Sequence, residues 1–263
     1  RGLGPDDPAR VEQLVSVAAL PGLPHGMGRS YGDVCLNPNG TLWVTTGLDR
    51  FVSFDAESGR LACEAGVLLG DIQRLAIPRG WMLPVTPGTQ WATVGGAIAN
   101  DVHGKNHHVD GTIGRHVEEL TLLLASGETL RCSPTENAET FDATIGGMGL
   151  TGVILSARLA LLPVETPWVR VVKRRGRCLE EVLARLEEEE SLSRYSVAWI
   201  DGLARGRALG RGVLMRGDHV LAAELPRGKA VRGSLPEKPG PNVPFEAPSA
   251  LLSPLTISAF DAL

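Results

Sequence analysis

The sequence predicts a loop-rich fold that combines β-strands with short helices, in two domains that meet near residues 160–168. Thirty-two glycines and eighteen prolines among 263 residues are too many for a helical bundle and favour strands joined by turns. Short strand-like runs alternate with helical patterns in the first half of the chain. The composition changes at Trp168, after which a cluster of arginine and lysine begins. We therefore expect one domain over 1–165 and a second over 166–263.

The composition is typical of a soluble globular protein, with 43% hydrophobic and 21% charged residues. A net charge of −4 argues against nucleic acid as a partner, because proteins that bind it carry a basic surface. No apolar run approaches the roughly 20 residues that span a bilayer, and no signal peptide is visible at a start that looks trimmed. Four cysteines without zinc or redox spacing are expected to be reduced thiols: Cys35, Cys63, Cys132 and Cys178.

Periodicity and turn signals predict the individual elements. Residues 1–20 are expected to be the end of a helix, and further helices are expected over 69–77, 137–145 and 178–190. Strands are expected over 41–46, 51–54, 60–65, 195–201 and 212–216. Ser126-Gly127 predicts a hairpin between 119–125 and 128–132. Phe141 is expected to point inward, and residues 226–254 to form a long loop. The 178–190 helix is expected to have one apolar face, made of Leu179, Val182, Leu183 and Leu186.

The most unusual segment is Thr86–His116, which is rich in glycine and histidine and poor in bulky apolar side chains. Such a segment is not expected to build a core. Glycine permits positive φ and close approach of the backbone to a ligand. Thr93–Ala97 is expected to offer consecutive backbone N–H groups in an anion-binding concavity. We interpret the segment as the wall of a site for a phosphate-bearing cofactor.

Two further glycine segments accompany it. Residues 24–33, PHGMGRSYGD, predict either an ordinary glycine loop or a polar turn in which Tyr31 presents its phenol to a ligand. Residues 146–152 contain a formal G-x-G-x-x-G, with a helix expected before it and a strand after it. A nicotinamide-binding fingerprint needs the opposite order, so we reject that interpretation.

Other kinds of site are disfavoured. His103, His107 and His108 have a spacing that suits metal ligands on a helix, but the neighbouring glycines disfavour such a helix and no metal is expected. The chain lacks both the G-x-S-x-G elbow of serine hydrolases and the glycine spacing of a P-loop. The basic cluster at 170–177 is either a solvated strand edge, which we favour, or a dock for lipid phosphates or an anionic substrate.

Taken together, the three glycine segments resemble a known family. PHGMGRSYGD, PGTQWATVGGAIANDVHGKNHHVDGTIGRH and GGMGLTGVI follow one another as in the FAD-dependent oxidoreductases of the vanillyl-alcohol-oxidase type, and the likeness extends to about residue 216. The resemblance implies an α+β fold, with a two-subdomain PCMH-type FAD-binding domain over 1–165 and a partial α+β substrate or cap domain over 166–263. Chains of this family continue beyond the point, inside the substrate domain, where this sequence stops.

The resemblance also implies which residues act. FAD is expected to contact Gly26, Met27, Gly28, Arg29, Ser30, Tyr31, Gly88, Thr89, Thr93, Gly95, Gly96, Asn100, His103, Gly104, Asn106, Gly152 and Val153. His103, Lys105 and Tyr31 are the expected catalytic residues, with His103 as proton acceptor. Many relatives bond the flavin covalently through a histidine of the first glycine loop. Arg29 stands at the matching position here, so FAD is expected to be non-covalent.

The implied activity is flavin-dependent oxidation of a secondary hydroxyl on a sugar. The preferred substrate is a pentose linked to polyprenyl phosphate, oxidised at its 2′ position as one step of an epimerisation that a partner reductase completes. Such a substrate implies a location at the periphery of the inner membrane, whereas a soluble substrate implies a cytoplasmic one. Two alternatives stay open: a soluble sugar, alditol or lactone oxidoreductase on the same scaffold, and a non-catalytic FAD-binding or partner-binding remnant.

Overall fold

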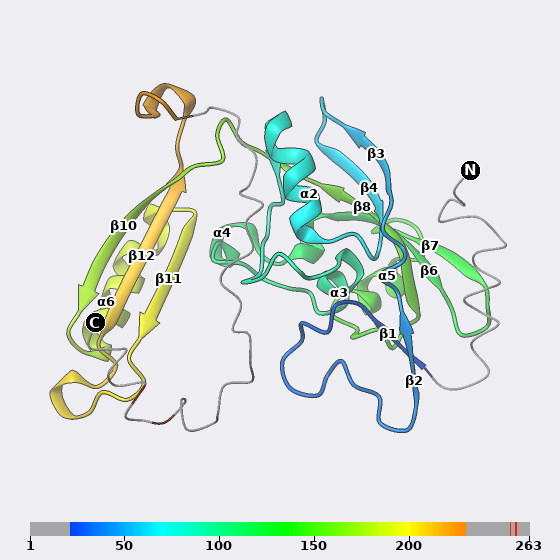
Figure 1. Ribbon diagram of the computed structural model, residues 1–263, viewed down its shortest axis with the longest axis horizontal. Coiled ribbons are helices and arrows are strands. Elements are labelled where there is room, and N and C mark those ends of the chain that lie inside the picture. The colour runs from blue at the N-terminus through cyan, green and yellow to red at the C-terminus, as the bar shows by residue number, and fades with distance from the viewer. Residues whose placement is uncertain (1–21, 230–252, 254–255, 257–263) are drawn as a thin grey trace. The chain divides into compact units, whose positions relative to one another are not determined.

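A computed structural model of the chain describes residues 22–229, 253 and 256 (Figure 1). It divides into two compact units: of the described residues, the first contains 22–167 and 226–229, and the second contains 168–225, 253 and 256. The helix expected within 1–20, and most of the loop expected over 226–254, lie outside the described residues. In the described part of the chain, no helix combines the length and apolar character needed to cross a membrane.

The first unit is built on a five-stranded antiparallel sheet in the order β3-β4-β8-β6-β7. Its strands are β3 Phe51–Asp55, β4 Arg60–Glu64, β6 Val117–Leu123, β7 Thr129–Cys132 and β8 Val153–Ala160. Two smaller pairs are β1 Gly22–His25 with β2 Thr41–Val44, which are parallel, and β5 Trp81–Met82 with β9 Leu162–Pro163. The predicted hairpin is confirmed, since β6 pairs with β7 and Gly127 has the positive φ, 85°, that its turn requires.

The helices described in this unit are short: α2 Leu69–Ala76, α3 Val94–Ala99, α4 His107–Asp110 and α5 Ala138–Thr144, with 3₁₀ turns η1 Ile77–Arg79 and η2 Ile113–His116. The predictions of α2 and α5 are confirmed, and Phe141 on α5 is buried. Pro78 lacks an N–H, so α2 gives way to η1 at Ile77, and the turn closes at Gly80 with φ 85°. Because α5 precedes residues 146–152 and β8 follows them, the predicted helix-then-strand order is also confirmed.

One core joins α2 and α3 to the five-stranded sheet (Figure 1). The expectation that Thr86–His116 adds nothing to this core is wrong. Val94, Ala97 and Ile98 on α3 are fully buried, at the three- and four-residue spacing of one helix face. Gly95 permits this packing, because a Cβ there would lie 2.9 Å from the Cβ of Ala65. Part of the glycine content therefore serves helix–sheet packing.

Cysteines also contribute to the core of the first unit. Cys63 and Cys132 are both buried, and all four cysteines of the sequence are free thiols in the structure. Burial raises the pKa of the Cys63 thiol to about 12, so it stays protonated at neutral pH.

The second unit is a three-stranded antiparallel sheet with one helix. The sheet has the order β10-β12-β11, and its strands are β10 Val169–Gly176, β11 Tyr195–Ile200 and β12 Gly212–His219. The helix is α6 Leu179–Glu189, and the 3₁₀ turns are η3 Glu190–Leu192, η4 Gly206–Ala208 and η5 Ala222–Glu224. Val182 of α6 is fully buried and would contact any side chain placed at Gly176. Leu183, expected on the same buried face, is instead 48% exposed, because each residue turns the helix about 100° away from the last.

The basic cluster lies along β10, which is an edge strand of this sheet. Lys173, Arg174 and Arg175 are all exposed, as a solvated strand edge requires. Arg177, beyond the end of the strand, pairs with Glu181 at 3.2 Å.

Glu181 provides a pH-dependent test of the second unit. Its carboxylate accepts hydrogen bonds from the Arg177 backbone N–H and from the Arg185 and Arg177 guanidinium groups, which lowers its pKa from 4.5 to about 2. A carboxylate with a depressed pKa stabilises the fold above the unfolded value, and this contribution is lost as the pH falls toward 2. We therefore expect Glu181→Gln to melt at a lower temperature than the unmodified protein at pH 7, with the difference shrinking between pH 4.5 and 2. An equal difference at pH 7 and pH 3 would contradict this account.

Candidate functional site

The three glycine segments that resemble one family converge around α3. A Cβ at Gly26 would lie 2.5 Å from Oγ1 of Thr93, so the first segment touches the second. A Cβ at Gly149 would lie 3.2 Å from Cδ of Pro24, so the third segment touches the first. The third segment also joins α3 directly, because the Gly146 and Met148 N–H groups donate to the carbonyls of Ile98 and Ala99 at 3.0 and 2.8 Å. Segments far apart in the sequence thus lie together around α3.

The loop after β1 presents open backbone donors. Gly28 and Gly32 have φ of 60° and 57°, the left-handed region that glycine adopts without strain. Within the described chain, the N–H groups of residues 27–31 have no hydrogen-bond acceptor. Met27, Gly28 and Arg29 are exposed, with the Arg29 guanidinium adding positive charge. Open N–H groups beside a cation suit an anionic group such as a diphosphate.

The anion-binding concavity predicted at Thr93–Ala97 does not form. The N–H groups of Val94 and Gly95 donate to the carbonyls of Val67 and Ala65 at 2.9 and 2.7 Å. The Gly96 N–H donates to Oγ1 of Thr93 at 3.1 Å, and the Ala97 N–H to the Thr93 carbonyl at 2.8 Å. These residues form the first turn of α3 and pack it against the segment after β4. Their backbone N–H groups are therefore already hydrogen-bonded inside the protein. Thr93 instead caps the N-terminus of α3, and its side chain contacts Gly26 in the first glycine loop.

The remaining predicted residues of the second segment lie on both sides of α3. Gly88 is exposed, with open space where a Cβ would be. Thr89 accepts a hydrogen bond from the Trp91 N–H at 3.2 Å, which orders the turn before the helix. Asn100 is exposed at the C-terminal end of α3 and donates to the Gly96 carbonyl at 2.8 Å.

Residues 102–113, which we call the histidine loop, present two of the predicted catalytic side chains to solvent. His103 and Lys105 are both exposed. The His103 backbone pairs with Thr112 across the loop, and its ring lies edge-on to His107 with centroids 5.8 Å apart. A histidine and an ammonium group on one ordered loop have the chemistry needed to accept a proton and to orient an anion.

Asn106 and Gly104 hold the histidine loop in place. Asn106 is buried, and its side-chain amide donates to the Pro84 carbonyl at 2.7 Å and to the Asp110 carboxylate at 2.5 Å. Its predicted role as a direct cofactor contact therefore becomes one of support, because both contacts lie inside the protein. A Cβ at Gly104 would lie 2.9 Å from the Thr86 carbonyl oxygen, so this position also requires glycine for packing.

Tyr31 does not contact the other predicted catalytic residues, and Gly152 and Val153 of the third segment offer a ligand little besides their backbone. Tyr31 is 96% exposed, and no hydrogen bond or ring contact joins it to His103 or Lys105 in the described chain. Val153 is buried in a cluster with Leu48, Leu123 and Leu155, which leaves only its backbone for a ligand. Gly152 is needed where it stands, because a Cβ there would lie 2.5 Å from the Leu123 carbonyl oxygen.

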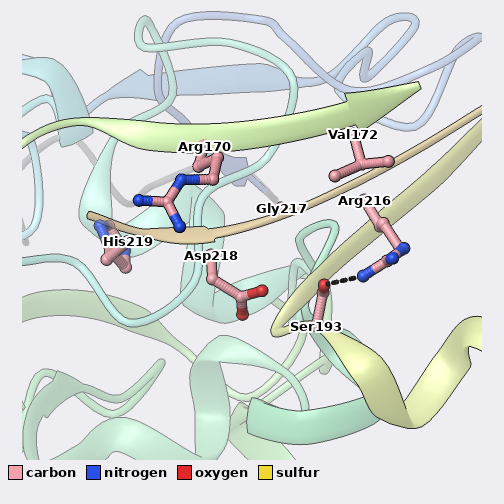
Figure 2. A pocket seen from close by; sticks show the side chains of 7 residues that line it. All are labelled: Arg170, Val172, Ser193, Arg216, Gly217, Asp218 and His219. Atoms are coloured by element: carbon pink, nitrogen blue, oxygen red, sulfur yellow. Dashed lines mark hydrogen bonds between the residues drawn. The ribbon is translucent and has the colours of Figure 1, made fainter. Parts of the chain in front are cut away.

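A separate polar pocket lies in the second unit. Its volume is 210 Å³ and it is lined by Arg170, Val172, Ser193, Arg216, Gly217, Asp218 and His219 (Figure 2). Arg216 donates to Glu189 at 2.7 Å and to Ser193 at 3.2 Å, and Arg170 pairs with Glu224 at 3.3 Å. These arginines are thus already engaged with the protein. Among the described residues, no three His, Cys, Asp or Glu side chains gather as metal ligands.

The contact between Gly26 and Thr93 gives a direct test of the convergence. Gly26→Ala should push the two loops apart, because the new Cβ would overlap Oγ1 of Thr93. We expect a roughly tenfold weaker affinity for FAD in a fluorescence titration, as overpacking typically costs 1–3 kcal/mol. Thr93→Ala in the same chain removes the obstructing atoms and should restore part of the affinity, less about 1 kcal/mol for the lost helix cap. Wild-type affinity in the single variant would show that the loops do not meet.

Comparison with known proteins finds similar sequences over most of the chain. Residues 3–133 match the family described as the FAD binding domain. The chain is 36% identical over 258 residues to decaprenylphosphoryl-β-D-ribose oxidase of Mycolicibacterium smegmatis, covering 96% of this chain and 54% of that protein. It is 30% identical over 200 residues to L-gulonolactone oxidase of Bos taurus, covering 72% and 43%. A putative D-arabinono-1,4-lactone oxidase of Neurospora crassa matches at 28% over 160 residues, covering 59% and 28%.

These relatives are longer proteins, and the chain spans about half the length of the first of them. The mixed helix-and-strand architecture agrees with the predicted α+β class. The family match includes the first glycine loop, α3 and the histidine loop, and FAD is the cofactor it carries. The chain therefore belongs to the PCMH-type FAD-binding family of oxidoreductases.

Proposed function

We propose that this chain is the flavin-binding part of an oxidoreductase that oxidises a secondary hydroxyl on a sugar. The observation that carries the proposal is the 36% identity, over 96% of this chain and so through both units, to decaprenylphosphoryl-β-D-ribose oxidase. The site is consistent with it, because three glycine segments meet around α3 and the histidine loop follows that helix. In this proposal the first unit holds FAD between two subdomains, and the second unit is the start of a substrate domain.

The open N–H groups of residues 27–31 would hold the diphosphate of FAD, with Arg29 supplying positive charge. The exposed backbone at Gly88 and the amide of Asn100 would contact the parts of the cofactor nearer α3. We propose a non-covalent flavin, because Arg29 replaces the histidine of the covalent relatives. Beside this loop, Nδ1 of His25 donates a hydrogen bond to the Cys35 carbonyl oxygen, 3.1 Å away.

Oxidation of an alcohol requires a hydride acceptor, which bound FAD supplies, and a proton acceptor, which the protein supplies. His103 is the residue that we assign as proton acceptor, since it is exposed on an ordered loop and carries a titratable ring. Lys105, two residues on, would orient an anionic group of the substrate. Tyr31 would line the same space, through the loop that touches Thr93.

The favoured substrate is a pentose carried on polyprenyl phosphate, oxidised at its 2′ hydroxyl as half of an epimerisation. The identity to the decaprenylphosphoryl-β-D-ribose oxidase covers 96% of this chain, against 72% for the gulonolactone oxidase. A reductase would then complete the epimerisation. The exposed Lys173, Arg174 and Arg175 on β10 would allow contact with anionic lipid at the inner-membrane periphery, whereas a soluble sugar would leave the protein in the cytoplasm.

Anaerobic reduction of the bound flavin tests this proposal. FAD-loaded protein is mixed with decaprenylphosphoryl-β-D-ribose or with L-gulono-1,4-lactone, and flavin absorbance is followed. Bleaching by the lipid-linked ribose alone supports the favoured substrate, and bleaching by the lactone alone supports the lactone oxidoreductase. Bound FAD that neither compound reduces would contradict both and favour a non-catalytic FAD-binding or partner-binding protein.

A further inference from the structure

The histidine loop begins and ends at two points that the structure joins. Its first residue, Val102, accepts a hydrogen bond on its carbonyl from the Ile113 N–H at 3.0 Å, and His103 pairs with Thr112. Val102 follows the end of α3, and Gly114 follows the end of the loop. Whatever fixes these two ends to each other also fixes the loop that carries His103 and Lys105.

The end of α3 has a geometry that usually calls for glycine. The Asp101 N–H donates to the Ile98 carbonyl at 2.9 Å, and the Val102 N–H to the Ala97 carbonyl at 3.0 Å. These two bonds form the Schellman arrangement of a helix C-terminus. In this arrangement the first residue after the C-cap is most often a glycine in the left-handed conformation. Here that residue is Asp101, with φ of 42°. A residue with a side chain is strained in this region, although aspartate tolerates it better than most.

The carboxylate of Asp101 explains why a side chain is present. Its Oδ1 accepts a hydrogen bond from the Gly114 N–H at 3.0 Å, across thirteen residues of sequence. A hydrogen bond to a charged acceptor is stronger than one between neutral groups. Gly114 is also packed closely, because a Cβ there would lie 2.8 Å from Oδ1 of Asp101 and 2.5 Å from Cγ2 of Ile145.

We propose that Asp101 is a positioning residue of the flavin site. By joining the end of α3 to Gly114, it holds both ends of the histidine loop and thereby fixes where His103 and Lys105 lie. The importance of this joint for catalysis rests on the proposed function, but the joint itself does not. If Asp101 only ended the helix, glycine at this position would relieve the backbone strain and lose nothing. If Asp101 positions the loop, glycine would also remove the hydrogen bond to Gly114 and loosen the loop.

Three forms of the protein separate these two roles. Asp101→Gly relieves the backbone strain and removes the carboxylate, while Asp101→Asn retains an oxygen acceptor and a residue that tolerates positive φ. Hydrogen–deuterium exchange is measured on the flavin-free proteins, comparing residues 102–116 with residues 117–123 of β6. For Asp101→Gly we expect loop exchange to rise about tenfold or more, unchanged exchange in β6, and FAD affinity to fall about tenfold. Asp101→Asn should recover most of both, but its Gly114 amide should still exchange measurably faster than in the unmodified protein, because a neutral oxygen accepts a weaker hydrogen bond than a carboxylate.

Loop exchange in Asp101→Gly equal to that of the unmodified protein would overturn the proposal, as would equal acceleration in the loop and in β6. If Asp101→Gly does not fold, Asp101→Asn alone decides: faster exchange of the Gly114 amide with β6 unchanged supports the joint, and unaltered exchange refutes it. A wild-type chain that binds no FAD would count against the proposed function, and the exchange experiment would still report on Asp101.

Discussion

Replacing His103 by glutamine is expected to slow reduction of the bound flavin by about 100-fold or more, since general bases contribute 10²–10⁴-fold to rate. Glutamine is similar in size and retains hydrogen-bonding groups, but its amide cannot take up the hydroxyl proton at neutral pH. His103 is exposed and lies outside the core, so the variant should fold and load with FAD. The measurement is stopped-flow absorbance of the loaded protein mixed anaerobically with decaprenylphosphoryl-β-D-ribose.

His108→Gln is the matched control, because it makes the same chemical change on the same loop at a residue to which we assign no role in the reaction. It should reduce at a rate close to that of the unmodified protein. A His103→Gln variant that reduces as fast as this control would remove His103 from the reaction. Lys105 or Tyr31 would then be the next residue to examine as proton acceptor.

The second large effect is expected from Gly104→Ala. The new Cβ would lie 2.9 Å from the Thr86 carbonyl oxygen and 2.7 Å from Oδ1 of Asn106. The backbone carbonyl cannot rotate away, so the histidine loop must shift. We expect a loss of about 1–3 kcal/mol of unfolding free energy, which is typical of overpacking, and a fall of tenfold or more in FAD affinity. Thermal unfolding and a fluorescence titration measure the two effects.

Gly47→Ala is the control for this substitution, since Gly47 is exposed in the same unit and a Cβ there meets nothing within 4 Å. It should leave both the unfolding transition and the FAD affinity nearly unchanged. If Gly104→Ala matched this control, the close packing of the histidine loop against Thr86 would be wrong.

Local sequence signals were sufficient for much of the fold. The Ser126-Gly127 turn, the proline that ends α2 and the apolar spacing of α5 each act within a few residues, and each prediction is confirmed. α3 was missed because Gly95 and Gly96 have low helix propensity, and packing against Ala65 compensates for it. That packing brings together residues thirty positions apart, so no local pattern reveals it.

The same distinction applies to the site. The order of the three glycine segments predicts the region of the site, but deciding which of its N–H groups are open requires the position of every nearby acceptor. The donors of Val94 and Gly95 are used by carbonyls of the segment after β4, whereas those of residues 27–31 have no acceptor in the described chain. The sequence contains one weak indication of the role of Asp101. Asn100 and Asp101 both tolerate positive φ, as the end of a helix requires, but the helix before them was not predicted.

The most direct test of the central claim, that the chain binds FAD without a covalent bond through the converging glycine loops, is the visible spectrum of the purified protein. The spectrum is recorded as purified and after addition of FAD and gel filtration, and again on the supernatant after acid precipitation. The account predicts a flavin spectrum that passes entirely into the supernatant. Flavin that stays with the precipitate would contradict the assignment at Arg29. A folded protein that remains colourless after incubation with FAD would contradict the site itself.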